Sequence, residues 1–422
     1  MGHEVKVLCA DSVLGGGIED RGSASQDEVI RTAWARVNYP VDVLLGGPRR
    51  VAVRGYRVGG RSSAWLQHLG HVYQSLFNLP DGYVGWLPWA CWEGAALLRR
   101  WRPDVILATA KPLSALLVGC ILGKSFDVPW VAEMRDLWVD NHYYRFSGWR
   151  KSLERWLEHQ VLSRAAGLVT ISEPLAALLQ ARYSQPLAVI RHGIDPEDYP
   201  SEASGEGPPL RGAAGGVPEG PPLRGAAGGV PEGPPLRELS LLYTGMAYPG
   251  FQDPAPLFEA IRMLGPASGI RVRFYGRNLG WVEALVSQFG LAGCVEVLPA
   301  IAHADCLLEQ RRADALLLLL WNDPEHRGVY TSKLFEYLGT RRPILAIGSS
   351  GNVAADLLLE RGVGFVSQSA DDIASKLREW IAVKAAGSAL PPSPPGALAG
   401  LSRADQTALL EVFLRQFTPG DT

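Results

Sequence analysis

The segment from residue 327 to 347, RGVYTSKLFEYLGTRRPILAI, holds the residues best suited to bind an anionic ligand. Thr331 or Ser332 can cap a helix whose first backbone N–H groups lack partners within the helix. Such a helix start favours a diphosphate, and Lys333 adds a cation at the same end. Glu336 follows one turn later on the face of Ser332, where its carboxylate can accept hydrogen bonds from both ribose hydroxyls of a nucleotide. An ordinary capped helix with a solvated Glu336 is the alternative, and spacing alone favours neither.

Short apolar strands that alternate with helices are the regular feature of residues 103–190. We expect strands at 103–108, 128–133, 167–171 and 187–190, and helices at 112–123, 149–165 and 173–182. The pattern before them is weaker, and there we expect a strand at 3–9 and helices at 27–37, 62–79 and 92–101. Strand–helix alternation predicts a parallel sheet with helices on both faces.

The same alternation resumes at residue 239. We expect strands at 239–244, 270–275, 295–298, 315–320 and 343–347, and helices at 253–264, 281–289, 304–312, 332–339, 352–361 and 371–385. A loop over 386–401 leads to a final helix over 403–417. Two such halves predict an α/β protein of two Rossmann-like, doubly wound domains facing a cleft. Ligands in sheets of this kind bind beyond the carboxyl ends of the strands.

A repeat separates the two halves. EGPPLRGAAGGVP occurs at 206–218 and 219–231, and a third copy begins at Glu232 and breaks off. The repeat is too rich in Gly and Pro to bury a core, so we interpret it as a linker without an assigned function. The expected domains are Rossmann-like domains at 1–200 and 238–385, with the linker at 201–237 between them and a loop and helix at 386–422 after them.

Composition excludes several classes of protein. Of 422 residues, 47% are hydrophobic and 20% are charged, which is typical of a globular protein, and a net charge of −2 gives no field to recruit nucleic acid. The five cysteines show no C-x-x-C spacing and no D-x-D pair occurs, so we expect neither a metal site nor another cofactor. The apolar run at 113–123 is too short to span a bilayer. We therefore expect a cytoplasmic protein whose membrane contact, if any, is peripheral.

Several segments together resemble the family-4 glycosyltransferases. GVYTSKLFEYLGTRRPIL is similar to that family's donor-binding segment, and LLYTGMAYPG and RFYGRN are similar to strand ends of the same domain. RPDVILATAKPLSALL, VPWVAEMRDLW, GLVTIS and IRHGIDPEDY resemble the family's N-terminal domain in order and spacing. The resemblance covers about residues 80–200 and 238–417, and it implies the GT-B fold. It also implies that the domain at 1–200 is the acceptor side, that the domain at 238–385 binds the nucleotide sugar, and that the loop and helix at 386–422 return to the first domain.

The resemblance also implies roles for residues of the donor site. Glu336 matches the second Glu of the family's E-x7-E motif, which binds the nucleotide ribose. The first Glu of the motif, which usually contacts the transferred sugar, would fall at Gly328 and is absent.

The diphosphate site of the family also departs from its usual form. Relatives commonly have an Arg and a Lys after the first strand of this domain, but GMAYPGFQDP, which opens at Gly245, has neither. We expect Arg277 and Lys333 to replace them, with Arg327 as a third candidate, because cations offset the charge of a leaving diphosphate. The expected donor site comprises Glu336, Lys333, Ser332, Thr331, Arg277, Gly245 and Arg327.

Acceptor-side candidates lie in the first half of the chain. Arg135 and Asp136 in MRDLW follow a predicted strand, and Asp136 can bind an acceptor hydroxyl or act as a base, which makes this pair the catalytic candidate. An Arg135–Asp136 ion pair that orders the next loop is the alternative. Asp81 in DGYVGWLPW is a candidate for the acceptor surface, and a turn before Gly82 is its alternative.

The resemblance implies a retaining, metal-independent transferase with a nucleotide-sugar donor and a glycan or lipid-linked acceptor, of the kind used in cell-envelope or exopolysaccharide synthesis. A degenerate, non-catalytic copy or partner subunit is an alternative, and a sugar-nucleotide epimerase of similar fold is a third. Relatives begin with a strand, a Gly-rich loop and a helix before a segment like GHEVKVLC, which here starts at Gly2. We therefore expect this chain to lack that strand and loop.

Overall fold

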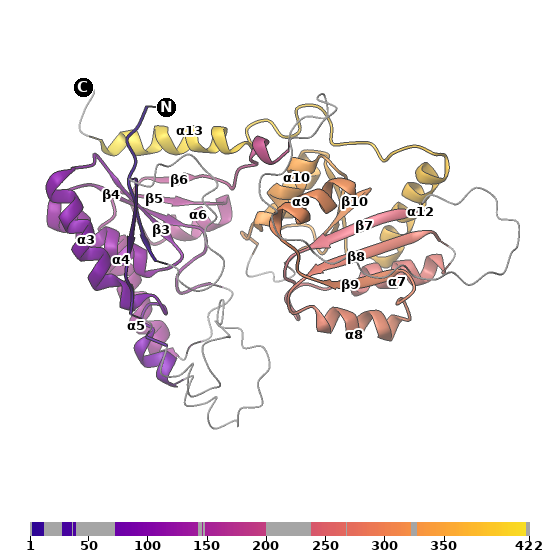
Figure 1. Cartoon of the computed structure of the whole chain (residues 1–422), viewed down its shortest axis with the longest axis horizontal. Helices are drawn as coiled ribbons and strands as arrows, with labels where there is room; N and C mark the ends of the chain where they lie inside the picture. Colours follow the sequence, from indigo (N-terminus) through magenta and orange to yellow (C-terminus); the bar gives the residue numbers. More distant parts are fainter. Residues whose placement is uncertain are drawn as a thin grey trace, which may run out of the picture. The chain divides into compact units, whose positions relative to one another are not determined.

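The computed structural model describes residues 2–11, 28–35, 37–38, 72–141, 146, 148–199, 238–266, 268–321 and 327–418. The chain forms two compact units (Figure 1). Unit 1 comprises Met1–Arg191 with Gln406–Thr422, and unit 2 comprises His192–Asp405. The repeat at 206–231 and most of the predicted helix at 62–79 lie outside the described residues. Among the described residues, none of the helices combines the length and the apolar character needed to cross a bilayer.

Unit 1 is built on a four-stranded parallel sheet in the order β3-β4-β5-β6. Its strands are β3 (Ile106–Ala110), β4 (Trp130–Met134), β5 (Gly167–Thr170) and β6 (Leu187–Val189). The connecting helices are α4 (Ser114–Phe126), α5 (Gly148–Leu162) and α6 (Glu173–Gln180), as parallel pairing requires a crossover between successive strands. β5 is buried at every position, which explains why its sequence is continuously apolar.

The N-terminal part of unit 1 differs from the prediction. β1 (Val7–Ala10) pairs in parallel with β2 (Val29–Thr32) in a separate two-stranded sheet, so the helix predicted at 27–37 is wrong. DEVIRTAWARV has helical spacing, but pairing with β1 across the chain overrides this local pattern. β1 packs on α3 (Leu87–Arg100). This helix follows a 3₁₀ turn at Val84–Trp86 and begins five residues earlier than predicted. Residues 72–79 are the described part of the helix predicted at 62–79, and of these residues 72–77 are helical.

The last helix, α13 (Arg403–Leu414), carries aromatic residues into unit 1. Phe413 is buried in a cluster with Val131 and Val169 of the sheet. A Cβ atom at Gly167 would lie 2.5 Å from Cζ of Phe417, so glycine at this position makes room for the end of the C-terminal segment. A 3₁₀ turn at Arg415–Phe417 follows the helix. Figure 1 shows α13 beside the strands of unit 1.

α5 turns three of its charged residues inward. Arg150, Glu154 and Glu158 recur at helical spacing and are 0%, 1% and 2% exposed. Arg150 Nε donates to Glu154 Oε1 over 2.6 Å, and its Nη1 atom donates to the backbone oxygen of Gln74 over 2.7 Å. Burial raises the pKa of both glutamates, while their hydrogen bonds act in the opposite direction.

The same carboxylates hold the loop after β4. Trp138 Nε1 donates to Glu154 Oε2 over 3.3 Å, and the backbone N–H of Val139 donates to Glu158 Oε2 over 3.2 Å. This loop begins at Arg135 and Asp136, so the buried charges of α5 fix the backbone that follows the two catalytic candidates.

Unit 2 contains a six-stranded parallel sheet in the order β12-β11-β10-β7-β8-β9. The strands are β7 (Leu239–Thr244), β8 (Ile270–Gly276), β9 (Val295–Pro299), β10 (Ala315–Leu319), β11 (Ile344–Ile347) and β12 (Gly364–Ser367). The helices are α7 (Ala255–Leu264), α8 (Gly280–Phe289), α9 (His303–Arg312), α10 (Ser332–Thr340), α11 (Val353–Glu360) and α12 (Ala370–Ala385), with a 3₁₀ turn at Pro196–Asp198. The sequence predicted each of these strands and α-helices within three residues except β12, which is short and partly exposed, and it did not predict the 3₁₀ turn.

Replacing Arg150 by Met tests the buried charge network. Because the variant leaves Glu154 buried without its ionic partner, we expect the free energy of unfolding of unit 1 to fall by about 3–5 kcal/mol. Lys151→Met is the matched control, since Lys151 is exposed and its pairing with Asp140 contributes about 0–1 kcal/mol. Urea unfolding followed by circular dichroism measures both. Equal losses in the two variants would contradict a stabilising role of the buried pair.

Candidate functional site

The carboxyl ends of β10, β7 and β8, which are neighbours in the sheet, meet the start of α10 in unit 2. Thr331 occupies the cap position of α10, as the sequence predicted for Thr331 or Ser332, with φ −94° and ψ 141°. Its side chain makes no capping hydrogen bond, and its buried Oγ1 atom has no hydrogen-bond partner in the described part of the chain. Ser332 is exposed at the first helical position. Backbone donors at this helix start therefore have no side-chain acceptor.

Lys333 reaches back across the end of β7. Its Nζ atom donates to Tyr243 Oη over 2.6 Å and to the backbone oxygen of Met246 over 3.2 Å. A Cβ atom at Gly245 would lie 3.2 Å from Cε of Lys333, so glycine leaves space for this side chain. Burial lowers the pKa of Lys333 to about 7, although the carboxylate of Glu336 acts in the opposite direction. An anion bound beside Lys333 would favour its charged form.

Glu336 is oriented by a buried amide. Gln310 of α9 is fully buried, and its Nε2 atom donates to Thr244 Oγ1 over 3.0 Å and lies 3.4 Å from Glu336 Oε2. Tyr199 Oη donates to the backbone oxygen of Glu336 over 2.8 Å. Gln310 was not predicted, because its only signal in the sequence is a polar residue on a helix that precedes an apolar strand.

The two arginine candidates lie in different places. Arg277 follows β8 and is exposed, and the adjacent Gly276 packs closely on Gly245, since a Cβ atom there would lie 2.1 Å from the Gly245 oxygen. Arg327 is beside the start of α11, where its backbone oxygen accepts from the N–H of Val353 over 3.0 Å. The loop of Arg277 therefore adjoins Gly245 and Lys333, whereas the backbone of Arg327 belongs to the next helix start.

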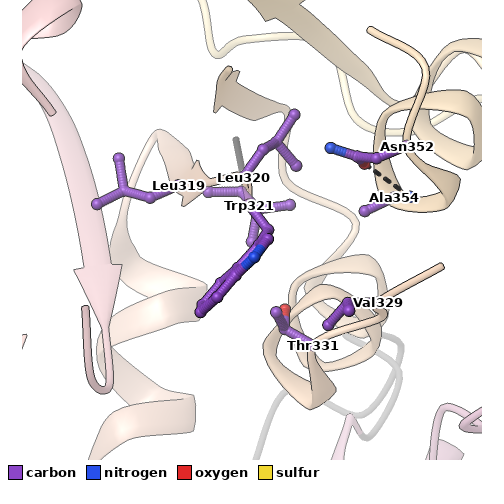
Figure 2. Close-up of a pocket in the computed structure, with 8 residues that line it drawn as sticks. Leu319, Leu320, Trp321, Val329, Thr331, Asn352 and Ala354 are labelled. Carbon is purple, nitrogen blue, oxygen red and sulfur yellow. Dashed lines mark hydrogen bonds between the residues drawn. The ribbon is translucent and has the colours of Figure 1, made fainter. Parts of the chain in front are cut away.

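A small pocket lies between β10, the segment before α10, and α11 (Figure 2). Trp321, Val329, Thr331, Asn352 and Ala354 are among the residues that line it. Asn352 Oδ1 caps α11 by accepting from the N–H groups of Ala354 and Ala355, while its buried Nδ2 atom has no hydrogen-bond partner among the described residues. Asn352 Nδ2 and Thr331 Oγ1 can therefore bond a hydroxyl group or a water molecule.

The acceptor-side candidates lie at the carboxyl ends of β3 and β4 in unit 1. Asp136 Oδ2 accepts from Lys111 Nζ over 3.0 Å, and both side chains are partly exposed. Arg135 Nε lies 3.3 Å from Glu133 Oε1, so Arg135 and Asp136 have different partners. Lys111 was missed because nothing local in AKPL links it to a residue on the next strand.

Asp81 holds the start of α4. Its Oδ1 atom accepts from Ser114 Oγ over 2.7 Å and from the N–H of Tyr83 over 2.8 Å, and its Oδ2 atom accepts from the N–H of Ser114 over 3.1 Å. These contacts fit the turn that the sequence left open as an alternative. Within the described residues, no group of three or more His, Cys, Asp or Glu side chains is placed to hold a metal ion.

Comparison with known proteins gives a family match for the first part of the chain and a fold for the whole. The model of the glycosyl transferase 4-like domain family matches residues 1–193. No protein with a curated description matches the chain. Among solved structures, Anabaena HepE in complex with UDP-glucose is 15% identical, with a TM-score of 0.53, over 97% of this chain and 99% of that one.

Two further structures support the same fold. Sucrose-phosphate synthase from Thermosynechococcus elongatus is 16% identical, with a TM-score of 0.52, over 78% of both chains. A glycosyltransferase from Rickettsia africae is 11% identical, with a TM-score of 0.51, over 98% of both chains. At such identities the likeness concerns the fold, which is GT-B, with two Rossmann-like units.

Proposed function

We propose that this chain, whose residues 1–193 match the model of the glycosyl transferase 4-like domain family, is a glycosyltransferase that moves a sugar from a nucleotide-sugar donor to a glycan or lipid-linked acceptor. Cell-envelope or exopolysaccharide synthesis is the setting that we infer, in a cytoplasmic enzyme with peripheral contact to the inner face of the membrane. Transfer would proceed with retention and without a metal ion or another cofactor.

The observation that carries the proposal is the pairing of a cation and a carboxylate one turn apart at the start of α10. Lys333 is held at the end of β7 by Tyr243 and Met246, and Glu336 is approached by Gln310. We assign the diphosphate to Lys333 and the first turn of α10, where cation and helix dipole both favour negative charge. The ribose hydroxyls would donate to Glu336.

Other groups would complete the donor site. The exposed guanidinium of Arg277 makes no hydrogen bond or ion pair with a described residue, so it is available for a phosphate. Gly245 lets the backbone approach the donor closely, and Ser332 offers a hydroxyl at the helix start. UDP-glucose in the complex of HepE supports a donor of the same chemical class.

In unit 1 we assign the acceptor to the surface around Asp136. Arg135, the preceding residue, and Asp81 are the other acceptor-side candidates. Asp136 would accept a hydrogen bond from the acceptor hydroxyl, and its contact with Lys111 keeps the carboxylate oriented. In a retaining reaction the acceptor oxygen bonds to the sugar carbon as the bond to the diphosphate breaks. The hydroxyl proton passes to a donor phosphate oxygen on the same face.

A non-catalytic nucleotide-binding protein is the second candidate function. Gly328, where family members have the Glu that contacts the sugar, favours it. Nucleotide binding without sugar transfer would distinguish this protein from an active transferase.

Glu336→Ala tests the donor site. We expect the Kd for the preferred nucleotide among UDP, GDP and dTDP to rise about 10- to 100-fold, because charge-assisted hydrogen bonds contribute about 1.5–3 kcal/mol each. Isothermal titration calorimetry measures the Kd, and Glu283→Ala, at an exposed position of α8, is the control. Unchanged binding in a folded Glu336→Ala protein would overturn the assignment.

The lowered pKa of Lys333 predicts a pH dependence of donor binding. Without a ligand, burial lowers the pKa of Lys333 to about 7, and a bound anion favours the charged form of this side chain. The affinity for the donor should therefore be constant below pH 7 and fall above it. Donor binding is measured between about pH 6 and 8.5 with a nucleotide sugar, not with a free nucleotide. The terminal phosphate of a free nucleotide would itself titrate near about pH 6, whereas the diphosphate of a nucleotide sugar is esterified at both ends. The decline should disappear in Lys333→Met, and an unchanged profile in that variant would assign the titration elsewhere.

Asp136→Asn separates acceptor chemistry from donor binding. We expect the donor Kd to stay within about twofold while sugar transfer falls by about 10- to 100-fold, because the variant loses a charge-assisted hydrogen bond to the acceptor hydroxyl that contributes about 1.5–3 kcal/mol. Transfer from a radiolabelled donor to membrane lipid extract provides the assay. Asp104→Asn, at an exposed position before β3, is the control. Full transfer activity in the Asp136 variant would contradict the contact with the acceptor and assign Asp136 a structural role only.

A further inference from the structure

The outward face of α5 is aromatic. Trp149, Leu153 and Trp156 are 53%, 38% and 59% exposed, and their spacing puts them in one stripe along the helix. The opposite face carries the buried ionic residues, so this helix reverses the usual distribution of polar and apolar side chains. Isolated exposed apolar residues are ordinary, but a contiguous stripe of this size marks a contact surface.

Neighbouring elements extend this surface. Leu76 and Phe77, both more than half exposed, lie in the helical segment whose backbone oxygens at Gln74 and Asn78 accept from Arg150 of α5. Their exposed side chains therefore adjoin the start of α5.

α3 contributes further tryptophans to the same layer of helices. α3 packs on α4 and α4 packs on α5, and Figure 1 shows the three helices next to one another in unit 1. Ala90, Gly94 and Leu98 form the buried side of α3, whereas Trp92 is 76% exposed and Trp89 is 42% exposed. We use the term aromatic face for Leu76, Phe77, Trp89, Trp92, Trp149, Leu153 and Trp156.

The charges beside the aromatic stripe of α5 are cationic. Lys151 and Arg155 are exposed next to Trp149 and Trp156, while both glutamates of the helix are buried. Asp140 pairs with Lys151 at 3.4 Å, with Arg155 at 2.8 Å and also with Arg182, so one carboxylate faces three cations. Lys124 of α4 is also exposed in this layer of helices. The surface therefore complements an anionic partner.

A second copy of the chain fits this surface poorly. Two copies that paired symmetrically through α5 would bring the same cations together, and like charges oppose such a contact. Tryptophan prefers the interface between lipid and water, where its ring is among acyl chains and its N–H group is hydrated. Cationic side chains beside it add attraction to anionic headgroups.

We propose that the aromatic face binds the surface of an anionic lipid bilayer, with Trp149 and Trp156 among the headgroups and Lys151 and Arg155 against lipid phosphates. The proposal specifies the residues of the peripheral membrane contact inferred above. It does not depend on the donor and acceptor assignments, because a bilayer can hold this face of unit 1 whatever the enzyme transfers.

Vesicle co-sedimentation of the full chain tests the proposal. Vesicles of phosphatidylcholine with about 30% phosphatidylglycerol should bind the protein, and pure phosphatidylcholine should bind it at least about tenfold more weakly. The double variant Trp149→Ser, Trp156→Ser should lose about tenfold or more of the partition to anionic vesicles. Lys151→Gln with Arg155→Gln should weaken binding to anionic vesicles and leave the residual binding to neutral ones unchanged.

The matched control is Leu409→Ser with Val412→Ser, because these two residues of α13 are 52% and 64% exposed and α13 covers the other side of the sheet from α5. Circular dichroism verifies that each variant is folded, and donor titration should give the same Kd for the tryptophan variant and the original chain. Equal vesicle binding by the tryptophan variant and the control, or no binding by the original chain, would overturn the proposal. A dimer that only the tryptophan substitutions dissociate in analytical ultracentrifugation would assign the face to a second copy instead.

Discussion

Parallel pairing through helical crossovers is the constraint on which both units depend. It brings the carboxyl ends of all strands in a sheet to one edge and starts the following helices there. In unit 2 this brings Lys333 onto Tyr243, which is 90 positions away in the sequence, across the end of β7. Gly245 and Gly276 allow the strand ends to approach closely, because a side chain at either position would meet neighbouring atoms. The order of the strands therefore brings the residues of the candidate donor site together, and the two glycines leave the space that they need.

The buried charges of α5 connect folding to the acceptor side in the same way. A buried ion pair contributes little net stability compared with apolar residues, but leaving one member unpaired is costly. Glu154 and Glu158 are each bonded to groups of the 138–139 loop, so their cost of burial is offset only when that loop is in position. The network consequently specifies the path of the chain after Asp136. With the ionic face turned inward, the other face of α5 carries the tryptophans.

Local sequence patterns were sufficient for most of the fold and for part of the site. Apolar strands of four to six residues between amphipathic helices predicted the four-stranded sheet and the six-stranded sheet apart from β12, and helical spacing alone related Ser332 to Glu336. The failures have a common cause. β2 has helical spacing but pairs with β1, and Gln310 and Lys111 acquire partners from other elements. Such contacts depend on the tertiary arrangement and leave no trace in the spacing of neighbouring residues.

With the donor bound as proposed, Gly328 would change the chemistry at the sugar end of the site. The resemblance to family-4 glycosyltransferases implies a carboxylate at this position, whereas here the adjoining pocket offers Thr331 Oγ1 and Asn352 Nδ2, both buried and without hydrogen-bond partners among the described residues. A sugar hydroxyl bound there would meet neutral groups. Neutral hydrogen bonds contribute about 0.5–1.5 kcal/mol, compared with about 1.5–3 kcal/mol for bonds to a charged group. Most of the donor affinity would then come from the diphosphate and ribose contacts at Lys333 and Glu336, and the sugar would be selected mainly by shape.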